Sequence, residues 1–264
     1  MTPSAPAPRH AQAGPEQLRV HVLGGFEIEG IPEHRVGSRK ARSIVKALAL
    51  ARGQAVRADT LLELVWGERP PQRANKELAV LVSRLRTTLG KDRLPRKQGG
   101  YALSVDWLDI DAMADLAEES HRRMRNGAYV EALASALSAL TLFRGPLLAE
   151  EPGAAWLATE RLAAERLAAT VRETAARAAL AVGELDLAAA MARLALDQDP
   201  YNEVALALLM TALVRSGRPA SALAEYASFR ERLGEDLGAD PSSETDAINT
   251  AILRHHPLPD SAPD

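Results

Sequence analysis

The sequence of 264 residues contains no cysteine, few aromatic residues and no long run of apolar residues. The absence of cysteine excludes disulfide bonds, thiolate catalysis and zinc sites with cysteine ligands. The longest stretches without charge, 132–143 and 204–214, are much shorter than the roughly 20 apolar residues that a membrane-spanning helix requires. The first residues also lack the basic start and apolar core of a secretory signal. We therefore expect a cytoplasmic protein with no membrane partner.

Motifs of catalysis and metal binding are missing as well. The sequence has no phosphate-binding loop, no nucleophile elbow and no pair of histidines at helical spacing. Among its six histidines only His255 and His256 are adjacent, and they lie in a proline-rich end of the chain. The acidic pair Glu150 and Glu151 is predicted to be solvated. We expect no enzyme activity, no catalytic residue, no cofactor and no metal site.

The charges that are present divide the chain into two unequal halves. Residues 17–106 contain 17 Lys and Arg and nine Asp and Glu, a net charge of +8, whereas residues 107–264 contain 14 and 25, a net charge of −11. A basic region of this kind favours a polyanionic partner. Alanine and leucine fill most apolar positions, because aromatic residues make up only 4%, and this bias favours helices.

The first half has the element order of a winged helix. Residues 1–16, rich in Ala and Pro, are predicted to be a disordered tail. Alternating apolar residues at 18–28 predict short antiparallel strands. Helical spacing then predicts helices at about 39–51, from an N-cap at Asp59 to Gly67, and at about 73–89. Residues 95–105, around Gly99 and Gly100, predict a hairpin with a basic tip.

The third of these helices is the predicted DNA-reading element. One stripe must face a core, and it contains Ala74, Leu78, Leu81, Val82, Leu85 and Leu89. The opposite face suits the major groove, where Arg or Lys reads guanine. We predict base contacts there from Arg73, Lys76, Glu77, Val80, Ser83, Arg84 and Thr87. Phosphate contacts are predicted at the hairpin tip and near helix N-termini, from Arg39, Lys40, Arg57, Arg96 and Lys97.

The second half is predicted to be a helical repeat. Gly127, Gly183 and Gly217 each precede an alanine-rich helix, and the last two are 34 residues apart, which is the tetratricopeptide period. The interval between Gly127 and Gly183 is longer because residues 145–153 insert a Pro/Gly loop. Three tryptophans are predicted to anchor the core: Trp66, Trp107 and Trp156. The predicted fold class is therefore an α+β winged helix followed by an all-α tetratricopeptide-like domain. The predicted domains are 17–106 and 107–254, with a second disordered tail at 255–264.

Several motifs resemble a known family. The segments 61–67, 78–90 and 99–101 are similar to the effector domain of OmpR-type response regulators. Over residues 18–254 the chain resembles the Streptomyces antibiotic regulatory protein family, in which a bacterial transcriptional activation domain follows the winged helix. Segments 143–146 and 237–242 match that second domain.

The resemblance implies a nucleoid-associated activator of a secondary-metabolite gene cluster, such as one for antibiotic biosynthesis. Such an activator binds double-stranded promoter DNA, with a homodimer on DNA as one arrangement. It recruits RNA polymerase through the sigma factor or the alpha subunit.

Two positions in the third helix depart from the family pattern. Glu77 stands where a small or hydroxyl residue is common, and Leu81 where a polar residue is common. A carboxylate near the groove repels phosphate unless it accepts a hydrogen bond from cytosine. Either the target sequence differs from the usual family repeats, or DNA binding is weak. Two other readings stay open: a protein-interaction module with a degenerate winged helix, and the N-terminal part of a larger multidomain regulator.

Overall fold

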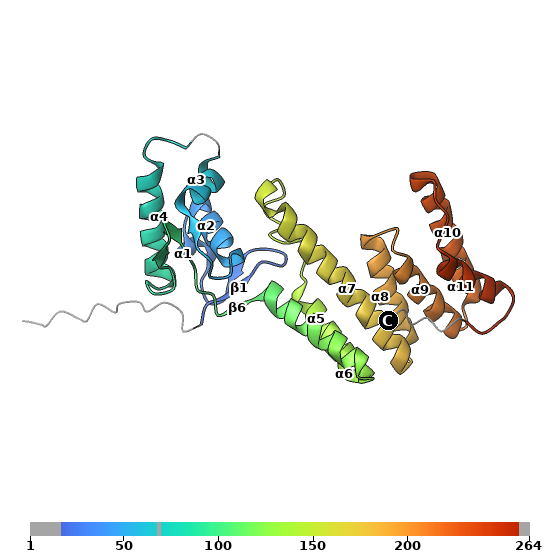
Figure 1. Ribbon diagram of the computed structural model, residues 1–264. Coiled ribbons are helices and arrows are strands. Elements are labelled where there is room, and N and C mark those ends of the chain that lie inside the picture. The colour runs from blue at the N-terminus through green and yellow to red at the C-terminus, as the bar shows by residue number, and fades with distance from the viewer. Residues whose placement is uncertain (1–16, 68–69, 259–264) are drawn as a thin grey trace, which may run out of the picture. The chain divides into compact units, whose positions relative to one another are not determined.

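The computed structural model describes residues 17–67 and 70–258 (Figure 1). The predicted tail 1–16 and residues 259–264 of the predicted tail 255–264 lie outside this range. The described chain forms two compact units. The residues through Asp111 and the later segment Leu147–Ala158 form the first unit, and Ala112–Pro146 with the residues from Thr159 onward form the second.

A small sheet opens the first unit. Its central strand β1 (Arg19–His21) pairs antiparallel with β2 (Glu27–Ile28) and parallel with β6 (Trp107–Leu108). Leu18, Val20 and Val22 are completely buried, as their alternation predicts. The sequence indicated the antiparallel pair but not β6, because a parallel partner from a distant part of the chain leaves no local signature.

Helices α1 (Glu33–Val36), α2 (Arg39–Leu50), α3 (Ala58–Trp66) and α4 (Ala74–Leu89) complete the core of this unit. The Ser38 side chain caps α2 by accepting the Ala41 N–H. The predicted N-cap of α3 is wrong. Arg57 occupies the cap position without a side-chain cap, and Asp59 lies in the first turn. Strand pairing holds Arg57 extended, so the helix begins at Ala58.

A second three-stranded sheet contains the hairpin. Strand β5 (Gly100–Tyr101) lies between β3 (Val56–Arg57) and β4 (Arg96–Lys97), antiparallel to both. Gln98 and Gly99, with φ of 48° and 76°, form the two-residue turn. Positive φ at both turn positions matches the twist of paired strands. The strand ends at Tyr101, earlier than predicted, although Ala102 and Leu103 remain buried.

Helices account for the second unit. The chain runs through α5 (Asp109–Arg125), which begins in the first unit, and α6 (Tyr129–Leu142). A 3₁₀ turn that belongs to the first unit, η1 (Ala155–Leu157), precedes α7 (Ala158–Val182). The remaining helices are α8 (Leu185–Gln198), α9 (Glu203–Arg215), α10 (Pro219–Leu237) and α11 (Ser243–Leu253).

Pairs of these helices stack as the 34-residue period predicts. Helix α9 packs against α8, α10 and α11. Gly217 lies between the pair α8 and α9 and the pair α10 and α11. Fully buried alanines, among them Ala175, Ala188 and Ala212, let the helices approach closely. Figure 1 shows α8 to α11 following one another. The predicted fold class, a winged helix followed by a tetratricopeptide-like domain, is confirmed. None of the described helices has the length and apolar character needed to cross a membrane.

Candidate nucleic-acid interface

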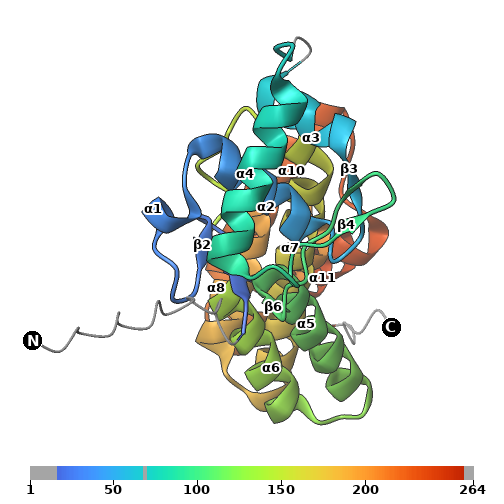
Figure 2. The same ribbon diagram turned by 90° about the vertical axis from the view of Figure 1, so that its left-hand side faces the viewer.

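Helix α4 has one buried side and one exposed side. Ala74, Leu78, Val82, Leu85 and Leu89 are at most 3% exposed, and Leu81 at the edge of this stripe is half-buried. The residues predicted to contact bases are all exposed: Arg73 at the N-cap, then Lys76, Glu77, Val80, Ser83, Arg84 and Thr87. In Figure 2, α4 runs across the front of the first unit. The helix therefore presents a continuous outer face.

Val80 lies at the centre of that face. At about 100° per residue, the other six residues fall within roughly 60° on either side of it. Val80 is 50% exposed, and it is the one large apolar residue of α4 that is exposed. The outer face thus places a small apolar centre between polar groups on both sides.

The charges on this face have no ion-pair partner among the described residues. Within the described part of the chain, no carboxylate forms an ion pair with Arg73, Lys76 or Arg84, and no cation pairs with Glu77. Arg86 behaves differently: its Nε donates to the Leu94 carbonyl at 2.9 Å. The outer cations are consequently available to an external acceptor, whereas Arg86 anchors the chain after α4.

The hairpin adds further cations. Arg96 and Lys97 are exposed on β4, and Lys97 pairs in register with Gly100. Arg57 pairs with Gly100 from the other side, on β3. The Arg57 side chain is 77% exposed and lies 3.6 Å from Asp59, a separation and exposure at which an ion pair stabilises little. The Arg86 guanidinium lies 5.9 Å from the Tyr101 ring, which connects α4 to the base of the hairpin.

Gly100, which the sequence placed in the hairpin, also allows a close approach of two strands. A Cβ atom at this residue would lie 2.0 Å from the Val56 carbonyl oxygen and 2.8 Å from the Arg57 Cα. Only glycine therefore allows β3 to approach β5 closely. The adjacent Gly99 serves the turn, so the Gly-Gly pair before Tyr101 was the available signal.

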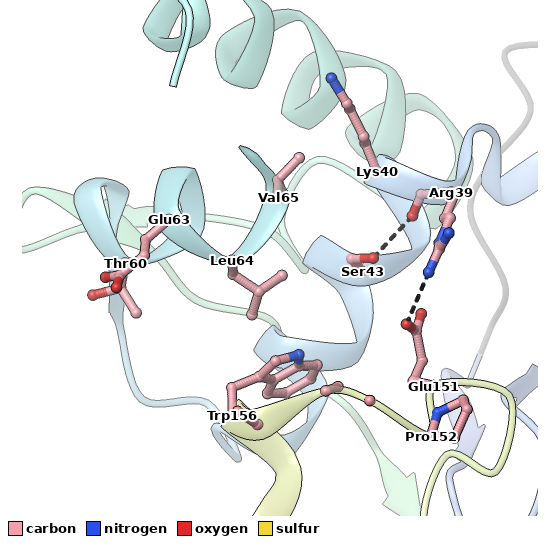
Figure 3. Close-up of a pocket in the computed structure, with 13 residues that line it drawn as sticks. Arg39, Lys40, Ser43, Thr60, Glu63, Leu64, Val65, Glu151, Pro152 and Trp156 are labelled. Carbon is pink, nitrogen blue, oxygen red and sulfur yellow. Dashed lines mark hydrogen bonds and ion pairs between the residues drawn. The ribbon is translucent and has the colours of Figure 1, made fainter. Parts of the chain in front are cut away.

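Arg39 and Lys40 lie in a different setting, shown in Figure 3. They line a cavity of about 950 Å³ bounded by α2, α3 and residues 151–156. Arg39 lies 3.6 Å from Glu151, and the Lys40 Nζ lies 4.6 Å from the centre of the Trp66 ring. Trp156 lines the same cavity and is 38% exposed, so its predicted role as a core anchor is wrong. Phosphate contact by Arg39 and Lys40 stays a prediction.

No cluster of three or more His, Asp or Glu side chains suited to a metal ion occurs in the described ranges 17–67 and 70–258.

Two family models match the chain. Residues 35–102 match the C-terminal domain of transcriptional regulatory proteins, and residues 108–253 match the bacterial transcriptional activator domain. The first match covers α2, α3, α4 and the hairpin, which contain the exposed face. The second covers α5 to α11.

Curated relatives and a solved structure agree with these matches. The chain is 34% identical over 238 residues to regulatory protein DnrI of Streptomyces peucetius, covering 83% of this chain and 86% of DnrI. It is 35% identical over 256 residues to regulatory protein AfsR of Streptomyces griseus, covering 96% of this chain but only 26% of AfsR, about a quarter of its length. The structure of Mycobacterium tuberculosis EmbR in complex with a low affinity phosphopeptide aligns with a TM-score of 0.83 and 26% identity. That alignment covers 92% of this chain and 66% of EmbR.

Proposed function

Because the chain belongs to the Streptomyces antibiotic regulatory protein family of transcriptional regulators, we propose that it binds promoter DNA sequence-specifically and activates a secondary-metabolite gene cluster. The observation that carries this proposal is the outer face of α4. Among the residues that the structure describes, its cations have no ion-pair partner, and its centre is exposed. A helix with these properties fits the major groove of B-DNA.

The roles of the residues follow from their positions. Arg73, Lys76 and Arg84 read base edges, and Glu77 accepts from a cytosine amino group. Arg96 and Lys97 contact the backbone or the minor groove beside the reading helix, and they position the protein rather than specify the sequence. Arg39, Lys40 and Arg57 supply further phosphate contacts.

The second unit supplies the contact with the transcription machinery. Its residues, 112–146 and 159–264, carry a net charge of −7, and stacked helix pairs offer a surface for a protein partner. We infer that this partner is the sigma factor or the alpha subunit of RNA polymerase. The protein then acts at the nucleoid, and it binds as a homodimer where the promoter has paired half-sites.

Salt dependence of DNA binding tests this proposal. With about four to six phosphate contacts, the logarithm of the binding constant should fall against the logarithm of salt concentration with a slope of roughly −4 to −5. Fluorescence anisotropy with the full chain and a labelled 30-base-pair duplex measures the slope. A flat response would favour the interaction-module alternative, which is consistent with Glu77 on the α4 face, a carboxylate that no described cation pairs with.

A further inference from the structure

A segment from the middle of the chain completes the first unit. Leu147 forms a β-bridge with Leu23, the Leu148 N–H donates to the Val22 carbonyl at 2.8 Å, and the Ala149 N–H donates to the Gly24 carbonyl at 2.9 Å. Leu147, Leu148 and Leu157 are completely buried. Residues 147–158 therefore belong to the hydrogen-bonded and apolar core of this unit, although the chain enters and leaves them through α6 and α7.

A buried lysine fastens this segment to α2. The Lys46 side chain is only 3% exposed, and its Nζ lies 2.8 Å from Glu150 Oε1 and 2.9 Å from Glu151 Oε1. The prediction that this acidic pair is simply solvated is wrong for Glu151, which is only 13% exposed, whereas Glu150 stays 41% exposed. A buried ammonium group needs compensating charge, and both carboxylates lie beside it. The ring of Phe26 lies 5.4 Å from the same nitrogen.

Glu151 is held in its charged form by these neighbours. Burial alone would raise the pKa of Glu151, but the hydrogen bond and charge of Lys46, together with the charge of Arg39, hold this pKa below its usual value. Glu150 accepts the Phe26 N–H at 3.2 Å. Both acids thus bind groups that lie before α3, and Figure 3 shows Glu151 directed toward Arg39.

We propose that the first unit needs residues 147–158 in order to fold stably and bind DNA. We further propose that Lys46 is the positioning residue that holds these residues in place. These residues fall inside the stretch that matches the activation-domain model. Helix α2 packs against both α3 and α4, so an uncompensated ammonium in its middle weakens the support of the helix that carries the outer face. The DNA-binding readout of this proposal rests on the proposed function, whereas its folding readout does not.

The test uses four variants of the full chain. Glu150→Gln/Glu151→Gln leaves Lys46 uncompensated, Lys46→Met removes the cation, and the combined triple variant removes both partners. Glu231→Gln/Glu235→Gln is the matched control, because it removes two exposed carboxylates from α10 and makes the same change in net charge. Two readouts are followed: amide hydrogen exchange, and the temperature at which anisotropy with a random-sequence 30-base-pair duplex is lost.

We expect Glu150→Gln/Glu151→Gln to lower the temperature at which half of the anisotropy signal is lost by about 5–15 °C, since the buried Lys46 charge then has no partner. Exchange should accelerate about tenfold or more in peptides 22–26, 39–50 and 147–154 together, with α9 unchanged. The triple variant should recover most of the loss, because no buried charge is left unpaired, and the α10 control should match the wild type.

Two results would overturn the proposal. One is faster exchange confined to peptide 147–154 with an unchanged midpoint, which would make the segment peripheral. The other is a triple variant as unstable as the double variant, which would remove Lys46 from its role. If the wild type binds no duplex, the proposed function fails instead, and the exchange data alone still decide whether the segment is part of the unit.

Discussion

Replacing Arg84 with alanine separates base reading from folding. Arg84 lies on the outer face of α4, about 40° from Val80 by helical geometry, and its side chain is exposed. No described carboxylate pairs with it. The substitution therefore removes a guanidinium without opening a cavity or leaving a partner unpaired. The chain and its core should fold as before.

The expected loss of base discrimination is larger than the expected change in the free energy of unfolding. A substitution at an exposed position without partners changes the free energy of unfolding by roughly 0.5 kcal/mol or less. A bidentate contact to guanine contributes about 1–3 kcal/mol of discrimination, which corresponds to about 5-fold to 150-fold in relative affinity. Arg84→Ala should thus leave the melting temperature nearly unchanged and relax specificity at one base pair.

The assay compares the variant with the wild type on a target duplex and on all its single-base variants. Loss of discrimination at one position, with nonspecific affinity slightly lowered, is the expected outcome. A uniform loss on every duplex would show that Arg84 contacts only phosphate, and unfolding would show that it supports the core. Arg125→Ala, at an exposed arginine in the last turn of α5, is the control and should change neither quantity.

Four further predictions concern the same two units. Replacing the thymine opposite Val80 with uracil removes only the C5-methyl group. Because a buried methyl group contributes roughly 0.8 kcal/mol, this change should weaken wild-type binding about fourfold. Binding by the Val80→Ala variant should be the same on both duplexes. Arg96→Ala/Lys97→Ala should weaken binding to all duplexes equally in anisotropy titrations; a changed sequence preference would contradict backbone contact. Gly100→Ala should cost about 1–3 kcal/mol in thermal denaturation by forcing β3 away from β5, so an unchanged melting temperature would count against that close approach. Burial would raise the pKa of Glu203, but hydrogen bonds from Ser242 and Thr245 hold this pKa below its usual value of 4.5. The free energy of unfolding should therefore fall as the pH drops below about 4.5. Denaturation curves of Glu203→Gln should show a weaker dependence on pH.

The periodic features of the fold were readable from the sequence. The apolar stripe of α4 predicted which residues are buried, with Leu81 half-buried at its edge. The 34-residue spacing of Gly183 and Gly217 predicted the stacked pairs of the second unit. Both patterns record contacts that repeat with the period of a helix or a repeat, so they leave a mark at regular positions in the sequence.

Features that depend on distant contacts left no such mark. Lys46 occupies a non-apolar position in the pattern of α2, and its burial follows only from acids more than 100 residues later. Gly100 is required by the Val56 carbonyl oxygen on another strand. The same reason hid β6, whose partner β1 begins at Arg19. Local composition cannot report a neighbour that the chain reaches only after folding.

The charge asymmetry of the sequence also changes once the distant segments are assigned. Residues 17–106 carry +8, but the first unit also includes residues 107–111 and 147–158. These add Asp109, Asp111, Glu150 and Glu151 and no Lys or Arg, which reduces the net charge of the three segments together to +4. Asp109 is completely buried and accepts the N–H groups of Val22 and Leu23.

These acids act within the core and at its rim. Burial raises the pKa of Asp109, against the effect of its hydrogen bonds, and Glu150 and Glu151 compensate Lys46. The outer face of α4 and the hairpin tip keep cations that no described carboxylate neutralises. A modest net charge of +4 then favours DNA through the placement of a few cations rather than through a strong overall field. The dependence of the binding constant on salt concentration should accordingly reflect the number of these local phosphate contacts rather than the net charge of the unit.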